Sequence, residues 1–508
     1  MSQPPSTELA RDHDWQRLDP RMLLVHPIRE VGRFIIPLLA VFVAGTATES
    51  PWQYLTIVIP IGLGVARYLT TSFRISGQRV ELRRGLLSRH VLSTQLDRVR
   101  TVDLTASPIH RILGLTTVRI GTGTASTGQD EQLDLDGLPA DRARQLRSEL
   151  LRVSTSSTTG DGSTTGDGST TGSAGVSAGS TNRLPAVRFE PSWLRFAPFT
   201  SSGVVIAAAL LGGGSQLLGS LGVFDDLDVD TSSVSVPLGL VAVIGVLTLA
   251  VAAVVLSVIG YLVTNWGFRL GHADRAWHVV RGLLTTRETS LDDERVAGVS
   301  IGEPLGLRAV GGARLNAIAT GLRATQQGSS SLVPPAPRPV IERAAAAVCG
   351  ADAPVTAPLR GHGPAARRRR YVRGLAPALV LLAVALLLVL ADWAPWWLLV
   401  VGGLVALAAL GLAVDRSRGL GHLLVDGYLV ARSGSLLRSR DVLGTEHVIG
   451  WNLRSTWFQR RVGLTSMLAT TAGGRGSVML LDVPEPTGVA LAHVGVPGLV
   501  EQFLEERS

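Results

Sequence analysis

The sequence predicts a membrane protein that combines six α-helical spans, arranged as three hairpins, with three copies of an α+β module. Two observations predict this class: three long apolar blocks, and a repeat in the polar segments that follow them. Of the 508 residues, 46% are hydrophobic and 17% are charged, a composition typical of a chain partly solvated by lipid. A purely soluble enzyme is therefore disfavoured.

The apolar blocks cover residues 34–66, 198–263 and 374–414, and each is interrupted near its middle. A helix needs roughly 20 residues to cross ~30 Å of hydrocarbon, so each block is expected to form a transmembrane hairpin. The first block is tight, because its halves hold about 14 or 15 residues each. It predicts either two crossings that borrow flanking residues or a thin re-entrant hairpin.

Charges around the blocks predict their orientation, because arginine is retained on the cytoplasmic side during insertion. The outer flanks of all three blocks are basic, and they contain Arg29, Arg33, Arg67, Arg74, Arg188, Arg195, Arg269, Arg367, Arg368, Arg369, Arg370, Arg373, Arg416 and Arg418. The interruptions carry acids and no arginine: Glu49, Asp225, Asp226, Asp228, Asp230 and Asp392. Trp52, Trp393, Trp396 and Trp397 stand near two of the turns, as an aromatic belt predicts. The turns are expected outside and both chain ends inside, in a multi-pass protein of the cell membrane.

The basic charge itself favours a membrane surface over nucleic acid as partner. The formal net charge is +8, the chain has no lysine, and much of the arginine lies beside the apolar blocks. Residues 1–33 lack the apolar core of a signal peptide and are expected to be cytoplasmic. The single cysteine, Cys349, excludes a disulfide framework and a cysteine-based zinc site.

A repeat becomes visible when the polar segments are aligned on Gly85, Gly282 and Gly434. An acidic residue, a basic residue, an arginine and a second glycine follow 12, 13, 26 and 29 positions later. The residues in these columns are Asp97, Arg98, Arg111 and Gly114 in the first copy, Glu294, Arg295, Arg308 and Gly311 in the second, and Glu446, His447, Arg460 and Gly463 in the third. Recurrence in so many columns predicts a common fold.

Each copy is predicted to contain several antiparallel strands followed by one helix. Short alternating runs at 80–82, 118–120 and 133–135, and the run at 478–483, are typical of strands. Helical patterns follow at Ala143, Leu146 and Leu150, at 341–348 and at 499–504. The modules are placed at 67–152, 264–350 and 415–508. Residues 153–190 form a flexible Ser/Thr/Gly linker, and residues 351–373 form a basic one.

The motif Ser107-Pro108-Ile109-His110-Arg111-Ile112-Leu113-Gly114-Leu115, with its counterpart at 455–464, resembles the bacterial pleckstrin-homology-like family of YdbS/YdbT-type membrane proteins. Residues 303–311 of the second copy depart most from this motif. The resemblance covers nearly the whole chain. It implies a PH-like module with a seven-stranded sheet or partial barrel closed by a C-terminal helix. It implies no catalytic residues, and at most a link to envelope stress or resistance to membrane-active peptides.

Several residues allow a functional and a structural interpretation. The acid–base pairs of the repeat, with the arginine 26 positions after each origin, are predicted to be structural ion pairs, the alternative being a repeated binding site. Arg367, Arg368, Arg369 and Arg370 are predicted to anchor the topology and to contact anionic lipid, the alternative being recognition of one headgroup. The glycine-rich run 121–128 predicts a hairpin loop, because a strand and not a helix follows it. Asp225, Asp226, Asp228 and Asp230 are interpreted as a solvated loop and not as a metal site.

These patterns predict a non-catalytic membrane scaffold or adaptor without cofactor or metal. Its expected partners are anionic lipid headgroups and another membrane protein or a second copy of the chain. A transport or export component is the alternative. It is disfavoured because no ionisable residue lies well inside a predicted span.

Overall fold

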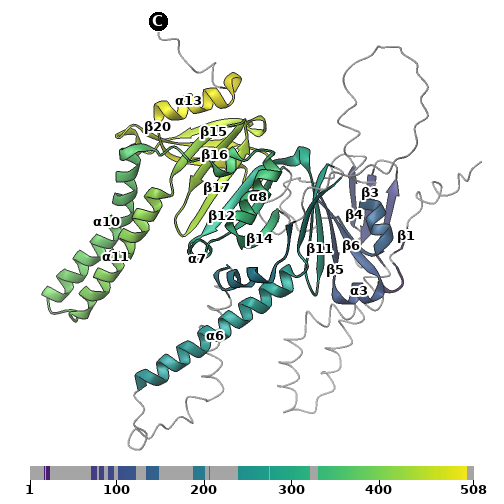
Figure 1. The fold of residues 1–508 in the computed structure, drawn as a ribbon, viewed down its shortest axis with the longest axis horizontal. Helices are drawn as coiled ribbons and strands as arrows, with labels where there is room; N and C mark the ends of the chain where they lie inside the picture. The colour runs from purple at the N-terminus through teal and green to yellow at the C-terminus, as the bar shows by residue number, and fades with distance from the viewer. Residues whose placement is uncertain are drawn as a thin grey trace, which may run out of the picture. The chain divides into compact units, whose positions relative to one another are not determined.

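The computed structural model describes residues 16–17, 19–22, 70–76, 79–84, 90–95, 101–121, 133–147, 187–200, 205, 238–273, 275–320 and 330–499. The chain divides into two units, residues 1–183 with 272–291 and residues 184–271 with 292–508. Antiparallel sheets and helices make up both units, which confirms the α+β part of the predicted fold class (Figure 1).

The first unit contains two antiparallel sheets. One has the order β1-β2-β3-β4, with strands Gln16–Arg17, Ser72–Ser76, Arg79–Arg84 and His90–Gln95. In the other, β7-β6-β5 of the first repeat continue into β11-β10-β9 of the second. Its strands are β5 (Thr101–Ala106), β6 (Leu115–Gly121), β7 (Leu133–Pro139), β9 (Arg269–Ala273), β10 (Ala276–Arg281) and β11 (Thr286–Asp292), with the two-residue strand β8 (Val187–Arg188) paired to β9. Helix α3, Pro108–Leu113, joins β5 to β6, and residues 140–147 form a helix after β7.

The second unit contains a six-stranded sheet of order β14-β13-β12-β17-β16-β15 and a three-stranded sheet β18-β19-β20. The strands of the larger sheet are β12 (Val296–Pro304), β13 (Gly312–Ala319), β14 (Ser331–Pro337), β15 (Gly421–Val425), β16 (Tyr428–Ser433) and β17 (Leu437–Gly444). The smaller sheet comprises β18 (Gly450–Arg454), β19 (Leu464–Thr470) and β20 (Ser477–Pro484). Short helices α7 (Leu305–Ala309) and α12 (Trp457–Arg460) occupy the place of α3, and α8 (Arg338–Cys349) and α13 (Glu485–Gly495) follow the last strands.

Strands of consecutive repeats pair within a common sheet, and the register of this pairing is the same at both junctions. Strand β11 pairs with β5 so that Ser290 lies opposite Val102, and β17 pairs with β12 so that Val442 lies opposite Val299. Counted from the repeat glycines, Val102 and Val299 are both 17 positions along, and Ser290 and Val442 are both 8 positions along. The third strand of one repeat is therefore added to the fourth strand of the preceding repeat by the same rule at both junctions.

The seven-stranded sheet expected within each module is replaced by this shared arrangement. Each repeat supplies six main strands, split three and three between different sheets. A three-stranded sheet leaves backbone N–H and C=O groups unpaired along its edges, and joining the next repeat satisfies them. The helix expected at 499–504 lies almost wholly outside the described residues. The described helix after β20 is α13, which begins at Glu485 directly after the strand and was not predicted.

Three described helices are long and apolar enough to cross a membrane. They are α6 (Leu238–Asn265), α10 (Gly363–Leu390) and α11 (Trp397–Arg418). Helices α10 and α11 form the hairpin predicted for the third block, with Gly374 packed closely against Ala413. Trp393, Trp396 and Trp397 are exposed at its turn. The first block lies outside the described residues, as does most of the first half of the second. Three of the six predicted spans therefore have a described helix long enough to cross, and crossing itself stays a prediction for all six.

The repeat glycines occupy turns that other residues would strain. Gly282 and Gly434 have φ values of 113° and 97°, and a Cβ atom at either would come within about 2 Å of a backbone oxygen. Gly114, Gly311 and Gly463 have φ values of 70°, 74° and 63° at the ends of the short helices. Because these conformations favour glycine, the recurrence of glycine reports a recurring backbone.

Buried side chains form a core in the C-terminal half of the first and third repeats. In the first, Val118, Ile120 and Leu146 belong to one cluster with Leu82 from the N-terminal half. In the third, Met467, Leu480 and Leu491 belong to a cluster that extends to Ala297 and Ile318 of the second repeat. The sharing of sheets is thus accompanied by shared hydrophobic burial.

Candidate functional site

The basic run at the start of α10 is divided between solvent and protein. Arg367 and Arg368 are exposed, whereas the side chains of Arg369 and Arg370 are 13% and 5% accessible. Successive residues in a helix point about 100° apart, so a run of four must wrap around the axis. The predicted lipid-contact set therefore consists of two outward and two inward arginines.

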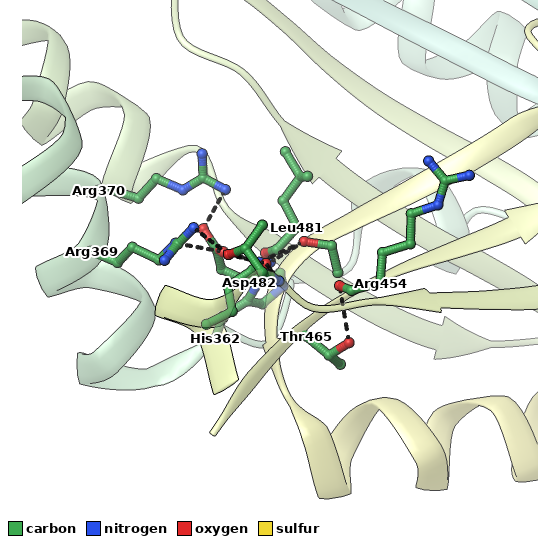
Figure 2. Close-up of polar contacts among 10 residues, drawn as sticks. His362, Arg369, Arg370, Arg454, Thr465, Leu481 and Asp482 are labelled. Atoms are coloured by element: carbon green, nitrogen blue, oxygen red, sulfur yellow. Dashed lines mark hydrogen bonds and ion pairs between the residues drawn. The ribbon is translucent and has the colours of Figure 1, made fainter. Parts of the chain in front are cut away.

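Asp482 of β20 is the partner of the two inward arginines. Arg370 Nη2 lies 2.6 Å from Asp482 Oδ2, and Arg369 Nε lies 3.1 Å from Asp482 Oδ1 (Figure 2). The carboxylate side chain is 2% accessible. A buried charge is costly unless it is paired, and here two guanidinium groups compensate one carboxylate.

The third repeat holds Asp482 through a network from two further elements. Gln459 of α12 donates from Nε2 to Asp482 Oδ1 at 2.7 Å and to Ser466 Oγ on β19 at 2.8 Å. Its Oε1 accepts from the backbone N–H of Thr456, which completes a capping box at the start of α12. The cap of a short helix thereby becomes part of the contact between the long apolar helix α10 and the third repeat.

A pair of buried histidines lies beside this network. His362 precedes α10 and donates from Nδ1 to the carbonyl of Leu481 at 2.7 Å (Figure 2). Its ring centroid lies 4.9 Å from that of His422 on β15. Burial lowers the pKa of both histidines, and that of His422 falls to about 4 with smaller contributions from the charges of His362 and Arg360. Both rings are therefore neutral near pH 7.

The arginines 26 positions after the repeat glycines contact the next repeat. Arg111 Nη1 donates to the carbonyl of Leu283 at 2.8 Å, and Arg308 Nη2 donates to Asp415 Oδ1 at 2.9 Å. Asp415 also accepts from Arg438 at 2.8 Å. In the third repeat, the side chain of Arg460 is exposed and contacts no carbonyl or carboxylate within the described part of the chain.

The other residues of the repeat motif are less closely associated. Arg295 Nε lies 3.4 Å from Asp292 Oδ2, and His447 Nε2 lies 3.5 Å from Glu446 Oε1. Glu294 lies in the same short 3-10 turn as Arg295. Gly85, Asp97 and Arg98 lie outside the described residues, as do Asp225, Asp226, Asp228 and Asp230. No group of three or more His, Cys, Asp or Glu side chains able to hold a metal ion occurs among the described residues.

Sequence reasoning missed Asp482, Asp415 and the histidine pair. Asp482 was detectable in principle as an acid at the end of an apolar strand, in the run 478–484. Such an isolated acid has several structural meanings, and its partners are over a hundred residues away. Asp415 follows an apolar span directly and is indistinguishable there from an interfacial charge.

A family comparison bears on the two repeats that contain the best-preserved motifs. The model of the bacterial PH domain matches residues 28–154 and 371–491. The chain contains bacterial PH domains. The matched ranges of this PH-domain protein contain its first and third repeats, and PH domains are generally non-catalytic modules that bind lipids or proteins. A search of curated proteins and a search of solved structures each found no match.

Proposed function

We propose that this PH-domain protein is a non-enzymatic, multi-pass membrane scaffold that presents three joined PH-like modules at the cytoplasmic face. The observation that carries the proposal is the attachment of the α10–α11 hairpin to the third repeat at both ends. The start of α10 is held by Asp482, and the end of α11 leads within a few residues into β15. A hairpin with both ends on one folded module crosses the bilayer an even number of times.

The same reasoning applies to the segments before the other two blocks. Met22 is buried against Gly137 of the first repeat, and Phe196, in the 3-10 segment η4 (Pro191–Phe199), is buried against Gly312 of the second. Each apolar block is therefore preceded by residues that pack on the module that follows it. This supports an even number of crossings for every block.

Strand pairing supports a common side for all three modules. Strand β5 pairs with β11 and β12 pairs with β17, so neighbouring repeats are hydrogen-bonded to each other. The three residues between β11 and β12, Asp293–Arg295, are too few to cross hydrocarbon. Because the flanks of the apolar blocks are rich in arginine, the cytoplasmic face is the side that the positive-inside rule favours.

Anionic headgroups are the ligand that the outward arginines favour. Arg367 and Arg368 are exposed on the first turns of a helix that is apolar from Gly374 onward, so they lie at the depth of the headgroups when the helix spans. Their inward neighbours are paired with Asp482, which halves their combined charge, and they are buried away from the surface. Each exposed arginine contributes about 1 kcal/mol near an anionic surface.

The test compares lipid retention by two arginine variants of the full chain. Native mass spectrometry from mixed micelles reports the preference for phosphatidylglycerol over phosphatidylcholine. In Arg367→Gln/Arg368→Gln this preference should fall, by up to roughly 30-fold, because about 2 kcal/mol of attraction is removed. The matched control is Arg343→Gln/Arg475→Gln, which removes two exposed arginines from other elements of the same unit. An unchanged preference, or an equal fall in the control, would exclude this headgroup contact.

A further inference from the structure

The sharing of sheets leaves two complementary strand edges among the described residues. Strand β4, the third strand of the first repeat, is hydrogen-bonded to β3 and forms one end of its sheet as described. Strand β18, the fourth strand of the third repeat, is hydrogen-bonded to β19 and forms one end of its sheet. At both internal junctions these two kinds of strand pair with each other. The described sheets therefore present one acceptor edge, β18, and one donor edge, β4, of the same kind of junction.

The register of the internal junctions predicts how a second copy would fit. Position 17 of one repeat lies opposite position 8 of the next at both junctions. Counted from Gly434 and Gly85, the same rule places Trp451 opposite Ser93 and Leu453 opposite Val91. Five residues of β18 would thus find partners within β4 without any shift of register.

Burial along the fourth strands supports a missing neighbour at β18. Leu104 of β5 and Ile301 of β12 occupy the position of Leu453, and both are buried. Leu453 itself is 44% exposed, and its expected partner Val91 is 56% exposed. Both side chains are apolar, both lie on strand edges that have no partner among the described strands, and the register of the internal junctions places them opposite each other. Monomeric proteins usually avoid such exposed apolar edges.

The repeat arginine supports the same conclusion. Arg111 and Arg308 each bind the following repeat, whereas Arg460 is exposed beside the free edge. Arg460 lies 26 positions after Gly434, as the other two do after their own glycines. It is therefore in the position to contact the first repeat of another copy.

We propose that copies of this chain join head to tail, with β4 of one copy added to β18 of the next in the register of the internal junctions. The contact is heterologous, because two different surfaces meet, so it generates a ring or an open row in the membrane plane. Main-chain hydrogen bonds supply the attraction, and the side chains facing one another select the register. Self-assembly goes beyond the scaffold function and does not depend on the lipid contact of Arg367 and Arg368.

Cysteine crosslinking between two tagged forms of the full chain tests the register. In a Cys349→Ala background, which removes the only native cysteine, one form carries Val91→Cys and the other Leu453→Cys. Both are expressed in the same membrane and treated with a short bifunctional maleimide. Residues directly opposite each other have Cβ atoms about 5 Å apart, so a product containing both tags is expected.

Controls distinguish this contact from other arrangements. Replacing Leu453→Cys by Val494→Cys, on the exposed face of α13, should reduce the mixed product at least tenfold, roughly the contrast between a contact and a random encounter. A mixed product no stronger than this control, with both cysteines reactive toward a monofunctional maleimide, would overturn the proposal. So would a stronger product between two Val91→Cys chains, or closure within a chain that carries both cysteines. Crosslinking of Leu453→Cys only to a different protein would assign the edge to another partner and also overturn it.

Charge reversal across the edge provides a second measurement. A chain with Leu453→Glu and Val91→Glu should lose species larger than the monomer in mass photometry, because like charges face each other across the strands. A chain with Leu453→Glu and Val91→Arg should retain them. Equal behaviour of the two variants would contradict the head-to-tail register.

Discussion

His422 is a residue whose burial makes the third repeat sensitive to acid. Its ring is 4% accessible and lies against His362, and neither His422 Nδ1 nor His362 Nε2 has a hydrogen-bond partner among the described residues. Protonation would place a charge next to a second histidine and close to Arg360, without a carboxylate to balance it. Loss of solvation on burial is the larger cost, and together with these charges it lowers the pKa of His422 to about 4.

The free energy of unfolding of the third repeat should therefore decrease as the pH is lowered. Between pH 6.5 and 4 the unfolded chain binds a proton at His422 that the folded chain does not bind, so lower pH favours unfolding. Between pH 7 and 5 the loss is about 2 kcal/mol. The thermal unfolding midpoint of the full chain in detergent should fall over this interval, and His422→Phe should flatten the dependence. His447→Phe, a histidine outside the pair, is the control, and equal slopes in all three proteins would contradict the assignment.

At the residue scale, the sequence could predict positions that repeat and could not predict positions that occur once. Gly114, Gly311 and Gly463 were predicted from their spacing, and each has the positive φ that makes glycine favourable. The contacts of Arg111 and Arg308 were assigned to their own modules, because spacing does not tell which copy a side chain reaches. His362 and His422 do not belong to the columns of the repeat, and they are separated by 60 residues in the sequence. No local pattern indicates that they meet.

At the scale of the elements, helix α10 is held against strand β20 by the ion pairs of Asp482 with Arg369 and Arg370. Asp482→Asn keeps the shape of the side chain and tolerates the positive φ of 54°, but it leaves Arg369 and Arg370 without a counter-charge. Breaking a buried ion pair on one side typically costs about 3 kcal/mol or more. The unfolding midpoint of the third repeat should drop accordingly, measured in the full chain by near-ultraviolet circular dichroism.

Asp426→Asn is the matched control for this substitution. Asp426 also has a positive φ, 49°, but it lies exposed in the turn between β15 and β16. Any strain specific to the left-handed conformation is therefore common to both variants. A midpoint that shifts equally in both would show that the ion pairs contribute nothing beyond the backbone conformation.

Strands and helices were largely predictable from local patterns, whereas their pairing was not. The alternating runs at 80–82, 118–120, 133–135 and 478–483 all lie in described strands, and the helical pattern at 341–348 lies in α8. Helix α13 was not predicted, because its apolar residues, Val489, Ala490 and Leu491, are few and its first turn contains a proline. The helix predicted at 499–504 lies almost wholly outside the described residues. Pairing depends on edges of strands that are far apart in sequence, and three copies with one pattern offer several equivalent partners.

At the scale of the whole molecule, charge patterning and strand sharing lead independently to one arrangement. Arginine at the outer flanks predicts that every module lies on the cytoplasmic side. Hydrogen bonds between repeats require neighbouring modules to lie on one side, whichever side that is. The sequence could supply the first argument. The second needed the pairing of β5 with β11 and of β12 with β17, which no single-repeat pattern contains.

Thiol labelling in intact cells measures this topology, provided that the reporter is chosen from the structure. Native Cys349 is unsuitable, because burial raises the pKa of its thiol to about 12 and it would resist labelling from either side. In a Cys349→Ala background, Trp393→Cys replaces a side chain that is 82% exposed at the turn between α10 and α11, and Val494→Cys replaces one that is 67% exposed on α13. A membrane-impermeant maleimide should label Trp393→Cys in intact cells and Val494→Cys only after permeabilisation. The reverse pattern would place the modules outside and contradict the positive-inside orientation. Labelling of both residues in intact cells would contradict a hairpin that crosses the bilayer.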